Sequence, residues 1–292
     1  MASPKVTLIT GCSSGIGLST AVKLAQDPNK SFRVYATMRN LAKKEDLEKA
    51  AGNALNDTLF ILKLDINEEE QIVSVVKEIT ERDGRIDVLV NNAAIGQMGL
   101  FEEVSMAYMK SLVDTNILGT FRLTQEVIRG MKARRSGRIV NISSLVGIVG
   151  MPYSPIYGAT KFALEGLTET LYPELRCFNV WISSIAPGPV RTKFVDNIET
   201  NKVDVPSSTD PNSPSAKLMA AYLSKLWASI SNDYQSGEDI ADLVLECLNS
   251  AEPLLRYPTS GWVDRYMKER FVDGVGSTAA KKFFEVMESV SK

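Results

Sequence analysis

Short apolar runs alternate along the chain with amphipathic stretches in a regular order. Runs rich in β-branched or apolar residues begin 26, 27 and 27 residues apart, at Val6, Phe32, Leu59 and Ile86. Between them the apolar positions recur with the period of a helix, for example over residues 68–82. Strand, helix and strand at this spacing predict βαβ units and a parallel sheet.

The second half of the chain continues the same pattern. Further buried strands are predicted over residues 138–143, 180–185 and 254–257, and long helical stretches over residues 102–134 and 157–177. No internal sequence repeat interrupts this order. The pattern therefore predicts an α/β fold.

The segment from Thr200 to Ser215 differs from its surroundings. Prolines at 206, 211 and 214 stand among several serines, which predicts a loop. A long loop inside a compact domain is often functional. A helix with aromatic residues is predicted just after it, around Tyr222 to Trp227. We interpret loop and helix together as a substrate lid, the alternative being a flexible insertion.

Composition is that of an ordinary globular protein, with 44% hydrophobic and 23% charged residues among 292. The formal net charge of −2 gives no reason to expect a nucleic-acid partner. The basic cluster from Lys132 to Arg135 is interpreted as a solvated helix end.

Three cysteines without a C-x-x-C pair favour a reducing compartment over a disulfide framework. No segment has the long apolar run of a signal peptide or a bilayer span. These features predict a cytoplasmic protein, and peripheral contact with a membrane stays open.

Histidine is absent from the sequence. This excludes histidine-based zinc sites and nucleophilic triads that depend on an imidazole, and the scattered cysteines offer no replacement. No metal is therefore expected, and proton chemistry must use Tyr, Lys, Asp, Glu or Cys.

A glycine-rich turn, TGCSSGIG at residues 10–17, follows the first predicted strand directly. Such a turn lets backbone amides approach a pyrophosphate, and the helix that follows adds a partial positive charge. The spacing is G-x-x-x-G-x-G, so the position after the first strand is the stronger part of the signal. Cofactor contacts are expected at Gly11, Ser13, Ser14, Gly15, Ile16 and Gly17.

Arg39 follows the second predicted strand, where a basic residue suits the 2′-phosphate of NADP. The hydroxyl of Ser13 or Ser14 is a candidate helper, and the alternative is an exposed surface arginine. Asp65, after the third strand, is placed to accept a bond from an adenine amino group. Small residues after the fourth strand leave room for adenosine, so Asn92 and Ala93 are further cofactor candidates, whereas Asn91 has a structural alternative.

Tyr157 and Lys161 lie four residues apart and therefore share one face of a helix. A free phenol, with a pKa of about 10, is a poor acid or base near neutrality. A nearby ammonium, together with the positive nicotinamide of an oxidised cofactor, would favour the phenolate. The pair is then suited to exchanging a proton with a substrate oxygen.

Two further polar positions complete the candidate chemistry. Ser143 and Ser144 end the preceding strand, where a hydroxyl would hold the substrate oxygen. Asn116 lies between apolar residues in a predicted helix, where it would bind a helix carbonyl or hold water in a relay to Lys161.

Seven segments, in this order, resemble the classical short-chain dehydrogenases/reductases: TGCSSGIG (10–17), LDI (64–66), NNAA (91–94), Asn116, ISS (142–144), YGATK (157–161) and PGPVRT (187–192). GCSSGIGL, VYATMRNL, KFALEGL and PLLRY resemble, within that family, the branch of the 17β-hydroxysteroid dehydrogenase type 1 and photoreceptor-type retinol dehydrogenases. Residues 153–156 read YSPI where that branch usually has FNDV, so the substrate's identity does not carry over with the chemistry.

The resemblance implies a single domain over residues 1–292, with a Rossmann-type doubly wound parallel sheet of about seven strands and helices on both faces. Residues 5–192 would form the cofactor-binding and catalytic core, and residues 193–292 the substrate loop, lid helix and C-terminal elements. It further implies NADP(H) as cofactor and a homodimer formed through the helices at 102–134 and 157–177.

The resemblance also implies a catalytic tetrad. Tyr157 would exchange the proton and Ser144 would orient the substrate oxygen. Lys161 would lower the tyrosine pKa and bind the nicotinamide ribose, and Asn116 would hold the relay water. Contacts to the nicotinamide end would come from Pro187, Gly188, Val190 and Thr192.

The expected substrate contacts, besides Ser144 and Tyr157, are apolar or aromatic: Leu145, Val149, Tyr153 and Phe194. Such a wall suits a lipophilic ligand with one reactive polar group. We therefore expect an NADP(H)-dependent oxidoreductase acting on a lipophilic alcohol or carbonyl, with a steroid or retinoid favoured over a terpenoid or polyketide-like compound. The alternatives are that half of this wall is simply core, and that the chain is a non-catalytic NADP-binding redox sensor or scaffold.

Overall fold

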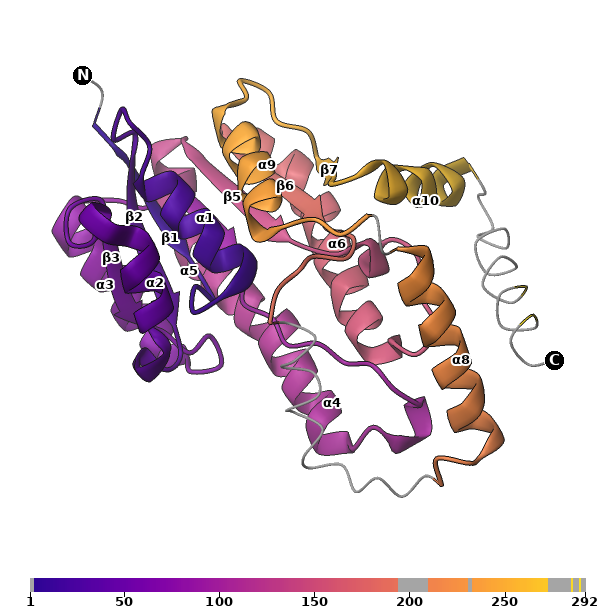
Figure 1. The fold of residues 1–292 in the computed structure, drawn as a ribbon. Helices are drawn as coiled ribbons and strands as arrows, with labels where there is room; N and C mark the ends of the chain where they lie inside the picture. The colour runs from indigo at the N-terminus through magenta and orange to yellow at the C-terminus, as the bar shows by residue number, and fades with distance from the viewer. Residues whose placement is uncertain (1–2, 194–209, 231–232, 273–284, 286–288, 290–292) are drawn as a thin grey trace.

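The computed structural model describes residues 3–193, 210–230 and 233–272, together with residues 285 and 289 (Figure 1). Seven parallel strands form one sheet in the order β3-β2-β1-β4-β5-β6-β7. Their bounds are β1 Lys5–Ile9, β2 Phe32–Met38, β3 Leu59–Lys63, β4 Val88–Asn91, β5 Gly137–Ile142, β6 Val180–Ala186 and β7 Arg256–Pro258. The chain builds outward from β1 to β3, then returns beside β1 and builds the other way, which confirms the doubly wound sheet.

The described helices connect these strands and cover both faces of the sheet (Figure 1). They are α1 Gly15–Ala25, α2 Glu45–Ala51, α3 Glu69–Asp83, α4 Met106–Val113, α5 Thr120–Arg134, α6 Pro155–Arg176, α8 Pro214–Ser229, α9 Gly237–Asn249 and α10 Gly261–Val272. Short 3₁₀ turns accompany them at η1 Leu41–Lys43, η2 Gly52–Ala54, η3 Phe101–Glu103 and η5 Leu145–Gly147.

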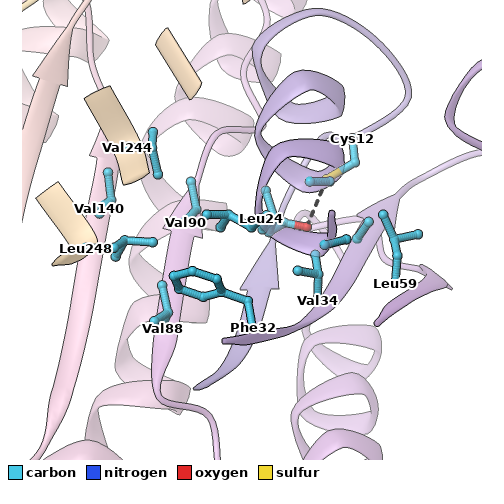
Figure 2. Close-up of a cluster of buried hydrophobic side chains, with 14 of the residues drawn as sticks. Cys12, Leu24, Phe32, Val34, Leu59, Val88, Val90, Val140, Val244 and Leu248 are labelled. Carbon is cyan, nitrogen blue, oxygen red and sulfur yellow. Dashed lines mark hydrogen bonds between the residues drawn. The ribbon is translucent and has the colours of Figure 1, made fainter. Parts of the chain in front are cut away.

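Two hydrophobic layers, one on each face, hold the sheet between its helices. Side chains alternate along each strand, so Val34 of β2 packs with α1, α2 and α9, whereas the next residue, Tyr35, packs with α3 and α5. Figure 2 shows part of the first layer, in which Leu24 of α1 and Val244 of α9 lie with side chains of the strands, such as Val34 and Val90. Burial on both faces explains why the strands read as continuous apolar runs.

The predicted helix over residues 102–134 is interrupted. Ser105 caps α4 by accepting a bond from the Tyr108 amide, so the helix begins at Met106. A π-helical segment, η4 Asp114–Gly119, then separates α4 from α5. α5 ends as expected at the basic cluster, where Arg135 adopts a left-handed conformation with φ of 52° and Lys132 pairs with Glu174. Strand β4 begins two residues later than predicted, at Val88.

A third hydrophobic cluster lies at the C-terminal side, where α8 and α10 pack against η5. α8 contains the predicted lid-helix residues 222–227, and Tyr222 is buried in this cluster. Most of the predicted lid loop, residues 200–209, lies outside the described residues. Within the described part of the chain, none of the helices combines the length and the apolar character that crossing a bilayer requires.

Candidate active site

A cavity of about 510 Å³ lies at the carboxyl ends of the strands. Its walls come from the segments that follow β1 to β6, and α8 and α10 supply the remaining side. The carboxyl edge near the switch between β1 and β4 is where open parallel sheets bind ligands. The cavity therefore brings most of the predicted site residues to one place.

The glycine turn after β1 has no room for additional atoms. Gly11 has φ of 72°, and a Cβ there would lie 2.8 Å from Ala93 Cα. A Cβ at Gly17 would collide with the Asn92 side chain and the Gly11 carbonyl. The Asn92 amide donates to the carbonyls of Thr10 (2.8 Å) and Gly11 (3.1 Å), which fixes the turn against β4. Gly17 itself does not line the cavity, and its contribution is the absence of a side chain.

Helix α1 begins at this turn and directs its first amides toward the cavity. Ser13, Ser14, Gly15 and Ile16 all line the cavity. Ser14 is the N-cap residue, but its hydroxyl makes no capping hydrogen bond. The helix N-terminus therefore offers amide donors and a partial positive charge to an anion.

The far end of the cavity, beyond β2 and β3, has a basic side. Arg39, Asn40 and Lys43 line it, as does Asp65. Asp65 Oδ1 accepts a hydrogen bond from the Asn67 amide at 3.0 Å, and Asn40 Oδ1 accepts one from Ala42 at 2.9 Å. The structure thus places the predicted Arg39 and Asp65 together and adds a second cation, Lys43.

At the other end, Tyr157 and Lys161 lie on the first turns of α6. Lys161 Nζ donates to the carbonyl of Ile142 at 2.8 Å and lies 5.7 Å from the centre of the Tyr157 ring. Burial lowers the pKa of the Lys161 ammonium to about 8, although the carboxylate of Glu165 raises it. Burial also raises the pKa of the Tyr157 phenol, and a hydrogen bond with Ser144 lowers it by less. In the protein chain alone, the positive charge of Lys161 does not offset the rise that burial causes in the pKa of Tyr157.

Ser143 and Ser144 both line the cavity, but their surroundings differ. Ser144 caps η5, because its Oγ accepts from the Val146 amide at 3.3 Å, and it interacts with Tyr157. The Oγ of Ser143 is buried and has no hydrogen-bond partner among the described residues. Ser144 is therefore the serine coupled to the tyrosine.

Asn116 occupies the π-helical segment and does not line the cavity. Its Oδ1 accepts from the Ile95 amide at 2.9 Å, and its Nδ2 donates to the Ile95 carbonyl (2.9 Å) and to Thr160 Oγ1 (3.0 Å). The side chain ties the segment after β4 to α6. It binds the backbone of the loop after β4 and not the helix carbonyl that was one expectation for it.

The segment after β6 closes the cavity between its two ends. Pro187, Gly188, Val190 and Thr192 line it, as predicted. A Cβ at Gly188 would lie 2.9 Å from Val263 of α10, so this segment is packed closely against the C-terminal helix.

The predicted substrate wall is only partly in the cavity. Leu145 lines it, whereas Val149 is buried in the third hydrophobic cluster, and Tyr153 packs against Tyr222 with ring centres 5.4 Å apart. Val149 therefore belongs to the core behind the wall, and the partly buried Tyr153 packs against that core without lining the cavity. Phe194 lies outside the described residues.

Several lining residues were not predicted as site residues: Gln97, Met98, Leu226, Trp227, Ile230, Tyr234 and Trp262. Trp227 falls in the predicted lid helix, so its aromatic character was an available signal. Trp262 and Tyr234 lie in segments without a motif, and only tertiary packing brings them to the cavity. Gln97 Oε1 accepts from the amide of Ile156 at 3.3 Å, next to Tyr157.

Comparison with known proteins agrees with this geometry. The sequence matches the short chain dehydrogenase family over residues 5–203. Human retinol dehydrogenase 8 is 41% identical over 280 residues, which cover 94% of this chain and 88% of that protein. Human 17-beta-hydroxysteroid dehydrogenase type 1 is 38% identical over 275 residues, covering 93% and 82%. The solved structure of ElxO with NADP bound has a TM-score of 0.73 at 27% identity, covering 90% of this chain and all of that one.

The chain belongs to the short-chain dehydrogenase/reductase family. Within it, the chain falls in the classical branch that contains retinol dehydrogenase 8 and 17-beta-hydroxysteroid dehydrogenase type 1. It is accordingly an oxidoreductase of the kind that interconverts alcohols and carbonyls, and the fold and enzyme class predicted from the sequence are confirmed.

Proposed function

We propose that this enzyme interconverts a lipophilic alcohol and its ketone or aldehyde, using NADP(H) as cofactor and Tyr157 as acid and base. One observation carries the proposal. Tyr157, Ser144 and Lys161 line a single cavity whose opposite end is the glycine turn and the basic side around Arg39. A proton-transfer group and a candidate anion site thus share one cavity.

The residues at the cofactor end fit a phosphate-bearing dinucleotide. The turn leaves no space for side chains at Gly11 and Gly17, so a ligand can approach the backbone. Arg39 and Lys43 would hold the 2′-phosphate, since guanidinium and ammonium groups pair well with phosphate. The unpartnered Ser143 hydroxyl offers a further contact toward the nicotinamide end. NADP is the ligand of ElxO, which has the same fold.

When bound, the nicotinamide supplies or accepts the hydride. The chain's own residues handle the proton: Tyr157 donates it to the substrate oxygen in reduction and removes it in oxidation. The Ser144 hydroxyl, which interacts with Tyr157, would hold the same oxygen. The Lys161 ammonium, 5.7 Å from the centre of the Tyr157 ring, would favour the phenolate, because attraction between charges is weakly screened in a buried site.

The substrate end of the cavity favours an extended lipophilic compound. Its wall consists of Leu145, Leu226, Trp227, Ile230 and Trp262, with Met98 and Met151 beside them. Aromatic and aliphatic side chains of this kind bind apolar surface and leave one polar corner at Tyr157. The names of the relatives favour a retinoid or a steroid, so these two classes lead the proposal.

The test is NADPH-dependent reduction of retinal, steroid ketones and small aldehydes, each repeated with NADH. We expect turnover with NADPH and a lipophilic carbonyl, and loss of that turnover in Tyr157→Phe with cofactor binding retained. Tight NADPH binding without turnover across the panel would contradict the proposal and favour the redox sensor or scaffold.

We further infer a homodimer formed through α4 to α6. Val113, Leu118 and Phe162 are 37–40% exposed on α4, η4 and α6, and these three elements contact one another. Exposed large apolar side chains gathered on neighbouring helices are typical of interfaces. Sedimentation should show a dimer, and Phe162→Glu should convert it to a monomer; a monomeric wild type would overturn this inference.

A further inference from the structure

A lysine and two glutamates continue from the active site along one face of α6. Lys161, Glu165 and Glu169 are spaced by four residues, so they lie above one another on the helix. Lys161 and Glu165 are 4% and 5% exposed, whereas the Glu169 side chain is 50% exposed. Arg256 of β7 contacts both carboxylates with a side chain that is 11% exposed.

Glu165 is held on the sheet side of α6 by two partners. Its Oε2 accepts from Arg256 Nε at 2.7 Å and from the Ser184 hydroxyl of β6 at 3.1 Å. Its Oε1 is buried without a hydrogen-bond partner in the described part of the chain. A buried carboxylate oxygen without a partner is destabilising, so anchoring β7 does not account for this residue. The half-exposed Glu169 already binds Arg256 and could anchor β7 without that cost.

Lys161 is a second buried charged group, of the opposite sign. Its ammonium is buried, and burial shifts its pKa down, so it holds its proton only with help from a nearby negative charge. The groups near it are Tyr157 and Glu165 of α6 and the carbonyl of Ile142. Arg256 of β7 and the non-titrating Ser184 of β6 lie behind them, against Glu165. Lys110 of α4 and Asp114 of η4, on elements that pack against α6, are exposed to solvent.

Glu165 is therefore the buried carboxylate on the same face as Lys161, one helical turn away. We propose that Glu165 is a positioning residue for catalysis: its carboxylate, fixed by Arg256 and Ser184, keeps the Lys161 ammonium protonated inside the active site. The proposal rests on the role assigned to Lys161 in the proposed function. In this proposal, the buried ion pair between Glu165 of α6 and Arg256 of β7 serves the chemistry of the active site.

The experiment measures the titration of Lys161 directly. The full-length protein is labelled with trace acetic anhydride over a pH series, and acetylation of Lys161 is quantified by mass spectrometry. Lys161 lines the cavity and so is open to a small reagent. We expect a wild-type midpoint near 8. In Glu165→Gln the midpoint should fall by about one pH unit, and kcat should fall about twofold at neutral pH and roughly tenfold above about pH 9.

Glu169→Gln is the matched control. It removes the other carboxylate that binds Arg256, on the same face of α6 but one turn further from Lys161. Its Lys161 midpoint and kcat should stay at the wild-type values. A shift of equal size in both variants would show a general effect of loosening β7, and would overturn the proposal.

A second variant covers the case in which Glu165→Gln does not fold. The pair Glu165→Met and Arg256→Met removes both buried charges together, a replacement that proteins often tolerate. Lys161 should again titrate at lower pH. An unchanged midpoint in these folded variants would overturn the proposal. Because labelling needs no turnover, a shifted midpoint combined with full activity of Tyr157→Phe would reject the proposed function and leave the charge-setting role of Glu165 standing.

Discussion

The two ends of the cavity are built in different ways. The cofactor end uses contiguous backbone, mainly residues 10–17 and the segment after β4, in contacts too close for any added atom. The substrate end uses side chains from distant segments, with Trp227 on α8 and Trp262 on α10 meeting Leu145 of η5.

This difference predicts two kinds of response to mutation. A tightly packed backbone turn can adopt only one conformation, so a single extra methyl group is disruptive. An apolar wall contributes in proportion to the area it buries, so changes there should be graded. Substitutions at the cofactor end should change the affinity for NADPH, and this change should be the same whichever substrate is present. Substitutions at the substrate end should change the ranking of substrates at constant cofactor affinity.

The largest effect should occur at Ser144, beside the proposed catalytic tyrosine. Ser144→Ala removes the hydroxyl that interacts with Tyr157, and we expect kcat to fall by about 10²- to 10³-fold, as for loss of an oxyanion donor. Ser143→Ala is the control, since its Oγ has no partner among the described residues, and its kcat should fall less than about tenfold. Single-turnover kinetics of both variants are the measurement. Equal losses of rate in the two variants would contradict the assignment of Ser144.

Arg39→Asp should have the next largest effect, and only at the cofactor end. Loss of a charge-assisted contact to the 2′-phosphate should weaken NADPH binding by about 10- to 100-fold, while NADH binding stays the same or improves. Fluorescence titration with both cofactors measures this. Lys43→Ala is the companion variant, with a smaller loss in the same direction. Equal losses for NADPH and NADH would contradict a phosphate-binding role for Arg39.

Most of the fold was predictable because its signal is local. Strands buried on both faces read as apolar runs, and βαβ units impose a regular spacing, so all seven strands were found to within about two residues. The π-helical segment at 114–119 was missed because its hydrogen bonds span five residues instead of four, a local difference that hydrophobic periodicity hardly registers.

The site residues that could be predicted from the sequence also differ between the two ends of the cavity. Most residues carried by short motifs, such as Gly11 and Lys161, line the cavity, whereas Gly17 and Asn116 do not. Val149 and Tyr153 were assigned to the wall from their apolar character, but that character serves core and pocket equally. Trp262 was missed because only the packing of α10 against η5 brings it to the site.

Gly17→Ala tests the rigidity of the cofactor end. The new methyl group collides with the Asn92 side chain and the Gly11 carbonyl, so the turn must move. We expect a loss of about 1–3 kcal/mol in unfolding free energy and weaker NADPH binding. Gly166→Ala on α6 is the matched control, because a Cβ there meets nothing within 4 Å and should stabilise the helix by about 0.5–1 kcal/mol. Denaturant melts and cofactor titration of both variants are the measurement, and a Gly17→Ala protein that behaves like wild type would show that the turn is not rigid.

The smallest expected effect belongs to the substrate wall, and it is the sharpest test of the comparison. Trp227 is partly buried on α8, lines the cavity and stacks on Tyr234 with ring centres 6.4 Å apart. Trp227→Ala removes apolar area from the wall, so kcat/KM for a long lipophilic carbonyl should fall by about 5- to 30-fold, the equivalent of about 1–2 kcal/mol. A small aldehyde, too short to reach α8, should be reduced as well as before, and affinity for NADPH should not change. Leu223→Ala is the control, because Leu223 lies one turn earlier on α8 and packs in the same cluster without lining the cavity. Its effect should be on stability and not on the choice of substrate. If both variants lowered kcat/KM equally for long and short carbonyls, α8 would be a structural cover, and the two ends of the cavity would not divide cofactor from substrate as proposed.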